Sequence, residues 1–160
     1  MPNYHRPGVP GATIFFTVAL AEHGSDLLVR EIARLRDAVR ATRGARPFAI
    51  DAWVVLPDHL HCVWTLPDGD ADFSARWGAI KGRFSRGLGA GRMRSSHAAR
   101  REKAVWQRRF WEHHIRDDAD FAAHVRYCWV NPVKHGIVQR PEDWPYSSVH
   151  RDIRLGRYVL

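Results

Sequence analysis

The chain of 160 residues has the length of one domain, and its 25 Lys and Arg residues against 17 Asp and Glu residues give a net charge of +8. This balance, with a pI near 10.3, points to a polyanionic partner, with nucleic acid as the first candidate and an anionic membrane surface as the second. No apolar run reaches about 18 residues and residues 1–10 lack an apolar signal-peptide core, so we expect no membrane-spanning helix and a cytoplasmic location. Cys62 and Cys128 each lie among apolar residues, which predicts buried, reduced thiols.

The N-terminal part of the chain predicts a strand followed by a helix. Residues 13–20 are mostly apolar and rich in β-branched and aromatic side chains, which favours a strand. Ser25 can cap a helix over residues 26–42, which Gly44 and Pro47 end. The apolar face of this helix is formed by Leu28, Ile32, Leu35 and Val39, at spacings i, i+4, i+7 and i+11.

Two further strands are predicted over residues 48–56 and 59–66, joined as an antiparallel hairpin by a two-residue Pro-Asp turn. The second strand begins with His59 and His61. Because side chains alternate along a strand, both imidazoles project to the same face of the sheet. Two imidazoles held in this way form half of a divalent-metal site. An isolated His-x-His motif is more often a pair of ordinary strand histidines, so the metal interpretation depends on the rest of the chain.

The positive charge is concentrated in one segment. Residues 76–109 contain eleven Lys or Arg residues and one acid, Glu102, so the rest of the chain has a net charge of −2. The segment begins in a predicted helix over residues 73–88 and continues into a predicted basic loop insertion at about 87–104, for which a solvated loop without function is the alternative. Aromatic residues follow at 106–111, and basic charge beside aromatics suits a groove for a nucleic-acid backbone. We expect backbone contacts from Arg83, Arg86, Arg108 and Arg109.

The C-terminal third predicts a strand and a helix. The strand is expected within residues 104–115, and Asp117 can cap a helix that runs to Asn131. Pro132 is expected to end this helix, because proline pushes the preceding residue out of the α region. Tyr127 and Asn131 lie one turn apart, beside an apolar stripe whose docking on the sheet would turn both toward the face with the imidazoles. The stripe consists of Phe121, Val125 and Cys128.

The predicted order is strand, helix, strand, strand, helix, strand, helix. This order favours an α+β fold, a ferredoxin-like or RRM-like sandwich with an antiparallel sheet and helices packed on one face. We expect residues 1–160 to form a single domain that contains the basic loop as an insertion.

Three motifs resemble those of a known family. The motif His59-Leu60-His61 resembles the His-hydrophobic-His signature of the HUH single-strand endonucleases, and Tyr127-x-x-x-Asn131 resembles their single-tyrosine helix. Nearly the whole chain resembles the REP-associated tyrosine transposases, relatives of the IS200-like transposases. The wider resemblance is carried by Val55-Leu56-Pro57-Asp58-His59-Leu60-His61, Asn131-Pro132-Val133-Lys134-His135-Gly136 and Trp144-Pro145-Tyr146-Ser147-Ser148. The chain departs from the family in its basic insertion and in Asp58, where many relatives carry asparagine.

The resemblance implies a bacterial enzyme that cleaves and rejoins single-stranded DNA. Tyr127 would attack a phosphodiester and leave a 5′-phosphotyrosine and a free 3′-hydroxyl, and reversal of this step would rejoin strands. His59, His61 and the amide oxygen of Asn131 would hold a divalent metal, Mg²⁺ or Mn²⁺. The implied partner is single-stranded DNA with hairpin-forming palindromic repeats, with no membrane, and the enzyme would act as a monomer or a homodimer.

Two other functional classes are considered beside this one. A noncatalytic single-stranded nucleic-acid-binding protein would use the sheet and the basic segment while its histidines stay inert. A histidine-triad nucleotide hydrolase would need an imidazole at the position of Val63. A zinc site that includes Cys62 is disfavoured, because Cys62 should point to the opposite face from the two histidines.

Rival catalytic side chains are weaker candidates. Tyr4 and Tyr158 lie in terminal arms, where nothing fixes a nucleophile, and Tyr146 lies in a Pro-Ser turn. The adjacent residues His113 and His114 would point to opposite faces of a strand. His124 is a candidate general base on geometry alone, with a surface histidine as the alternative.

Overall fold

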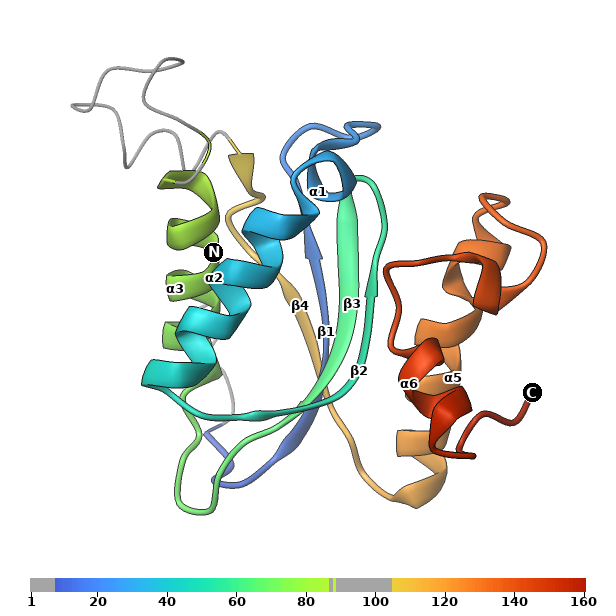
Figure 1. Cartoon of the computed structure of the whole chain (residues 1–160). Coiled ribbons are helices and arrows are strands. Elements are labelled where there is room, and N and C mark those ends of the chain that lie inside the picture. Colours follow the sequence, from blue (N-terminus) through green and yellow to red (C-terminus); the bar gives the residue numbers. More distant parts are fainter. Residues whose placement is uncertain (1–7, 87, 89–104) are drawn as a thin grey trace.

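A computed structural model describes residues 8–86, 88 and 105–160 (Figure 1). The predicted insertion at 87–104, apart from Leu88, and the rival nucleophile Tyr4 lie outside the described residues.

Four strands form one antiparallel sheet in the order β2-β3-β1-β4, which is the ferredoxin-like order. The first three strands lie within one residue of their predicted bounds. The last is shorter than predicted, because the chain at Trp106 makes only an isolated bridge with Leu20 and regular pairing begins at Trp111. The strands are β1 (Thr13–Ala19), β2 (Ala49–Val55), β3 (His59–Thr65) and β4 (Trp111–His114).

The N-terminal helical segment is divided into two helices, α1 (Leu27–Arg30) and α2 (Ile32–Ala45), where a single helix was predicted. The break lies at Glu31, whose backbone angles (φ −109°, ψ 35°) leave the helical region. The Leu28 amide donates to the Pro57 carbonyl, so α1 is held by the β2–β3 turn. Helix α3 (Phe73–Arg86) agrees with its prediction and packs on α2.

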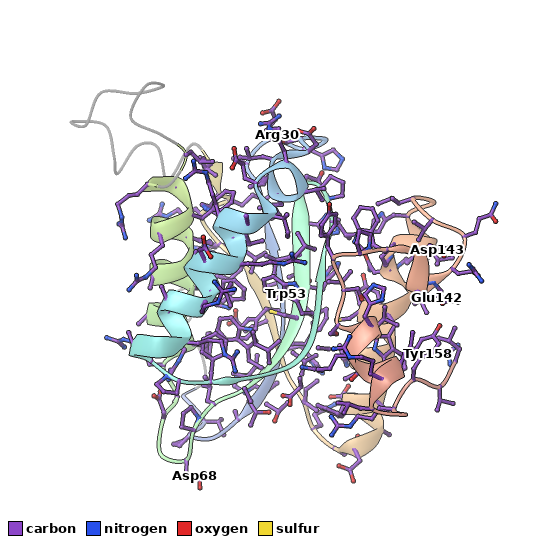
Figure 2. All side chains as sticks on the ribbon, viewed as in Figure 1. Arg30, Trp53, Asp68, Glu142, Asp143 and Tyr158 are labelled. Carbon is purple, nitrogen blue, oxygen red and sulfur yellow. The ribbon has the colours of Figure 1, made fainter. Side chains whose placement is uncertain are left out.

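Helices cover both faces of the sheet, with α2 and α3 on one side and α5 (Asp118–Lys134) and α6 (Val149–Arg154) on the other (Figure 1). The predicted α+β class, an antiparallel sheet with packed helices, is confirmed, but the prediction of helices on one face is wrong. The sequence carried a partial sign of this arrangement, because Phe15 and Val63 place buried apolar side chains on the same face as Thr17 and the two histidines. Figure 2 shows side chains filling the space on both sides of the sheet.

The two faces have separate cores. On the side of α2 and α3 the core includes Phe16, Leu60 and Trp64, and on the side of α5 it includes Phe15 and Val63. The two cysteines are buried free thiols, with Cys62 in the first core and Cys128 in the second, which confirms the prediction of reduced thiols.

The motif at residues 144–148 covers the outer edge of β2. The Tyr146 carbonyl accepts from the Val55 amide, the Ser148 hydroxyl accepts from the Trp53 amide, and the Trp144 indole donates to the Val55 carbonyl. This segment therefore protects an edge strand that would otherwise expose unpaired backbone groups.

Helix α5 runs past Pro132 to Lys134, so the prediction that Pro132 ends it is wrong. The helix is capped as predicted at its start, where the Asp117 carboxylate accepts from the Asp120 amide. Beyond its last residue the helix is closed by Gly136, whose φ of +70° allows the Gly136 amide to donate to the Val133 carbonyl and the Ile137 amide to donate to the Pro132 carbonyl. A proline near the last turn removes one helical hydrogen bond, and this paired closing motif offsets the loss.

Over the described ranges, no helix has the length and apolar character needed to cross a bilayer.

Candidate active site

The two imidazoles of β3 project to the sheet face that α5 covers. The ring centroids of His59 and His61 are 5.0 Å apart, while Leu60 and Cys62 belong to the core on the opposite face. The predicted alternation is confirmed, and it places Cys62 away from the histidines, as expected.

Each imidazole is held through its Nδ1 atom. His61 Nδ1 lies 2.8 Å from the Thr17 hydroxyl of β1, and His59 Nδ1 lies 2.7 Å from the Asp58 carboxylate, to which it can donate. This leaves His61 Nε2 buried without a hydrogen-bond partner among the described residues. Histidines that bind metals are fixed in this way by a partner on the other ring nitrogen.

The surroundings of two imidazoles, those of His61 and His135, favour the neutral form. Burial, followed by the nearby His59, His135 and Lys134, lowers the pKa of His61 to about 3. Burial also lowers the pKa of His135, with His59 and Lys134 as further causes. His61 is therefore uncharged at neutral pH and keeps a lone pair for a cation.

Tyr127 lies beside these imidazoles. Its ring centroid is 5.1 Å from that of His61, in an edge-to-face arrangement, and it also packs edge-to-face on Phe15 at 5.7 Å. The Lys134 ammonium lies 5.0 Å from the centre of the Tyr127 ring. The structure thus brings the predicted nucleophile and one predicted metal ligand together within a single chain.

Asn131 lies on the same helical stripe, between Tyr127 and His135, at spacings of four residues. One turn before Asn131, the ring of Tyr127 contacts that of His61. One turn after it, the ring of His135 contacts that of His59, at 5.3 Å between centroids. Asn131 is fully buried, and neither its Oδ1 nor its Nδ2 has a partner among the described residues. A buried amide without partners is expensive, so this position suits a residue that binds something the protein does not itself supply.

A pocket of ≈ 290 Å³ opens at His59, His61 and Tyr127, and the buried Asn131 is not among the residues that line it. Sequence reasoning did not assign Thr17, Lys134 or His135 to the site, and it also missed Ala19, Leu20, His23 and Gln107. Lys134 and His135 could have been found from their spacing to Tyr127 and Asn131, had the helix not been ended at Pro132. The lining residues are Thr17, Ala19, Leu20, His23, Asp58, His59, His61, Gln107, Tyr127, Lys134 and His135.

The predicted arginines fall into two groups, and all four are exposed. Arg108 and Arg109 directly follow Gln107, which lines the pocket. Arg83 and Arg86 lie on α3, across the sheet from α5, and are not brought to the pocket (Figure 1).

A second group of potential ligands lies farther along the same face. His113, Asp120 and His124 offer ligand atoms within 4.8 Å of one another. The Asp120 carboxylate already accepts from His113 and from the Arg116 amide, and the pKa of Asp120 is lowered, chiefly by that amide. His124 Nδ1 lies 2.8 Å from the Asp120 carbonyl oxygen, so the predicted base candidate is tied to its own helix. His114 contacts Phe73 on the opposite face, as predicted.

The rival tyrosines in the described ranges have other surroundings. Tyr146 contacts the Trp144 ring at 5.3 Å, and Tyr158 contacts the Trp129 ring at 5.0 Å on the outer side of α5 (Figure 2). Neither lines the pocket beside the imidazoles.

Comparison with known proteins gives close relatives over the whole chain, although no family model matches. The chain is 47% identical over 160 residues to the REP-associated tyrosine transposase of Escherichia coli K12, covering 100% of this chain and 90% of that protein. It is 41% identical over 160 residues to a putative REP-associated tyrosine transposase of Haemophilus influenzae, covering 99% and 91%.

Two solved structures are similar. A REP-associated tyrosine transposase bound to a REP hairpin superimposes with a TM-score of 0.88 at 46% identity, over 99% of this chain and 89% of that one. A putative transposase from Deinococcus radiodurans has a TM-score of 0.50 at 15% identity, over 78% and 94%, and shares the fold alone.

Proposed function

The chain belongs to the REP-associated tyrosine transposases, and on that basis we propose that it cleaves and rejoins single-stranded DNA with Tyr127 as the nucleophile. The observation that supports this most strongly is the contact between Tyr127 and His61, whose ring centroids lie 5.1 Å apart. The Nε2 atom of His61 is buried and has no hydrogen-bond partner among the described residues. Cleavage of a phosphodiester needs a nucleophile, which the phenol can supply, close to a metal ligand, which this nitrogen can supply.

The proposed reaction is a phosphoryl transfer in two reversible steps. The Tyr127 oxygen bonds to phosphorus as the bond to the 3′-oxygen breaks; the phenolic proton is lost and the 3′-oxygen gains one. The products are a 5′-phosphotyrosine and a free 3′-hydroxyl. Attack of a 3′-hydroxyl on the phosphotyrosine reverses the exchange, so rejoining needs no nucleotide cofactor.

A divalent metal fits the residues present. His59, His61 and the Asn131 amide oxygen would hold it, since His61 Nε2 and Asn131 Oδ1 are buried and unpaired and His59 is oriented by Asp58. When bound, Mg²⁺ or Mn²⁺ supplies Lewis-acid polarisation of the scissile phosphate. The imidazole ligands make Mn²⁺ at least as suitable as Mg²⁺.

The cationic side chain of Lys134 supports the same chemistry. Its ammonium stands over the Tyr127 ring at 5.0 Å, so it can attract the scissile phosphate and stabilise negative charge as the phenol reacts. Because Tyr127 and His61 meet within one chain, we propose that a monomer completes the site and that a homodimer is not required.

The proposed substrate is a hairpin with single-stranded flanks, by analogy with the relative whose structure holds a REP hairpin. Arg108 and Arg109 would contact the backbone near the pocket, and Arg83 and Arg86 would contact more distant phosphates. If several of these contacts form, binding should weaken steeply with salt, and equal affinity at low and moderate salt would contradict them.

The experiment that tests this function incubates a labelled hairpin oligonucleotide with the protein and Mg²⁺ or Mn²⁺. The native protein should give a protein–DNA band that survives denaturation, and Tyr127→Phe should give none while still binding the hairpin. Tyr158→Phe, at the outer side of α5, is the matched control and should retain the band. Absence of the band with the native protein under either ion would favour the noncatalytic binding protein instead.

A further inference from the structure

Two tryptophans of the run at residues 106–111 have different surroundings. Trp106 is 2% exposed and belongs to the core, whereas Trp111 is 57% exposed. An exposed indole on a strand can bind a ligand, because burial of its large apolar surface is favourable.

The sheet register places Trp111 beside the candidate active site. Thr17 pairs with Trp111 on one side and with His61 on the other, and its hydroxyl is the group that holds His61 Nδ1. Trp111 also meets Phe15 edge-to-face at 5.8 Å, and Phe15 in turn contacts the rings of His61 and Tyr127. The exposed indole is therefore separated from His61 only by strand β1, and Phe15 contacts both the indole and Tyr127.

Neighbouring rings restrict the orientation of the indole. Its ring lies parallel to that of His113, at 7° and 6.0 Å between centroids. His113 is itself stacked on His124 at 4.7 Å and bonded to the Asp120 carboxylate at 2.8 Å. A rigid aromatic ring loses little conformational entropy when a flat ligand stacks on it, so this arrangement is preorganised for stacking.

We propose that Trp111 is the binding platform for one unpaired nucleobase of the substrate strand, close to the phosphate that Tyr127 attacks. The proposal rests on the proposed function, because it takes the phosphate to lie at the pocket of Tyr127 and His61. A strand with its phosphate there carries its bases within reach of neighbouring surfaces, and base–aromatic stacking is the usual way in which proteins hold single-stranded nucleic acid. Arg108 and Arg109, exposed just before Trp111, supply charge for the adjoining backbone.

The test measures binding without cleavage. Fluorescence anisotropy is recorded for a labelled hairpin with single-stranded flanks, in EDTA and on a Tyr127→Phe background, and is repeated with an abasic site at each flank position in turn. Trp111→Ala should weaken binding of the intact hairpin by about tenfold, and Trp111→Tyr should retain most of the affinity. At one abasic position the loss caused by Trp111→Ala should disappear, because the base that stacks on the indole is already missing.

Ile153→Ala is the matched control, since Ile153 is also an exposed large apolar residue, at 43%, but lies on α6. It should bind the intact hairpin as well as the unsubstituted protein does. The proposal is overturned if Trp111→Ala binds normally, or if its loss is equal for all abasic substrates, which would indicate a general effect on the fold. Because this test measures binding and no covalent step, a negative result would contradict the role of Trp111 without contradicting cleavage by Tyr127.

Discussion

The Thr17 hydroxyl lies 2.8 Å from His61 Nδ1, across the β1–β3 pair. In the tautomer that leaves Nε2 free for a metal, Nδ1–H donates to this hydroxyl oxygen. The contact therefore fixes the direction of the imidazole and is compatible with the tautomer that a metal at Nε2 requires.

The first prediction is that Thr17→Val weakens binding of Mn²⁺ by about 10- to 100-fold, because it removes the partner of Nδ1 while keeping the shape of the side chain. Isothermal titration calorimetry with Mn²⁺ measures this loss. Thr13→Val is a matched control on the same strand, since it breaks a cross-strand contact with Thr65 at 2.9 Å. Equal Mn²⁺ affinities for the two variants would show that Thr17 does not orient His61 toward a metal.

A second prediction concerns Asp58, which lies 2.7 Å from His59 Nδ1 and also accepts from the Gly24 amide at 2.8 Å. Asp58→Ala removes both acceptors and should reduce Mn²⁺ affinity by about 10- to 100-fold. Asp58→Asn keeps one acceptor oxygen for His59, so it should reduce Mn²⁺ affinity clearly less than Asp58→Ala does. The same calorimetric titration ranks the three proteins, and a loss for asparagine as large as that for alanine would contradict this role.

The central pair of the site could be predicted from the sequence because strand alternation is a strict geometric rule. His59 and His61 are two residues apart on β3, so any strand at this position sends both rings to one face. The four-residue spacing of Tyr127 and Asn131 is equally local. Which face of the sheet α5 would cover was not local information, because it depends on how a helix distant in sequence packs on β2 and β3.

The remaining part of the site depends on contacts that no local rule gives. Thr17 approaches His61 only through the register of β1 against β3, which pairs residues 44 positions apart. Lys134 and His135 were missed because a proline rule ended the helix too early. The proline rule placed the end of the helix at Asn131, whereas the helix runs to Lys134, because the left-handed Gly136 provides the closing hydrogen bonds.

This closing glycine gives a third prediction. An added methyl group at Gly136 would meet no atom within 4 Å, so Gly136→Ala changes mainly the backbone preference at φ +70°. It should lower the free energy of unfolding by about 1 kcal/mol, because alanine disfavours the left-handed region. Gly44→Ala is the control of opposite sign: Gly44 lies inside α2 with equal space around it, and alanine there should stabilise the protein by about 0.5–1 kcal/mol. Urea unfolding of both variants tests the pair, and the same sign for both would refute the assignment.

The fourth prediction concerns the ion pair between Asp70 and Arg76. Arg76 is 1% exposed and donates two hydrogen bonds to the Asp70 carboxylate, at 3.0 and 2.9 Å. These bonds from Arg76, with a further bond from the Asp72 amide, lower the pKa of Asp70 from 3.8 to about 2. Asp70→Asn should therefore lower the free energy of unfolding at pH 7 by about 1 kcal/mol, a value that allows for solvent screening of the partly exposed carboxylate.

The pH dependence of this difference has a definite sign. Below pH 4 the unfolded chain takes up a proton at Asp70 that the folded chain still resists, so the native protein loses this contribution as the pH falls from about 4 toward 2. The Asn variant has no such group to protonate, and the gap between the two proteins should close over the same interval. Urea midpoints for both proteins at pH 7, 4, 3 and 2.5 measure the gap. A gap of constant size down to pH 2.5 would show that the Asp70 carboxylate does not stabilise the fold through Arg76.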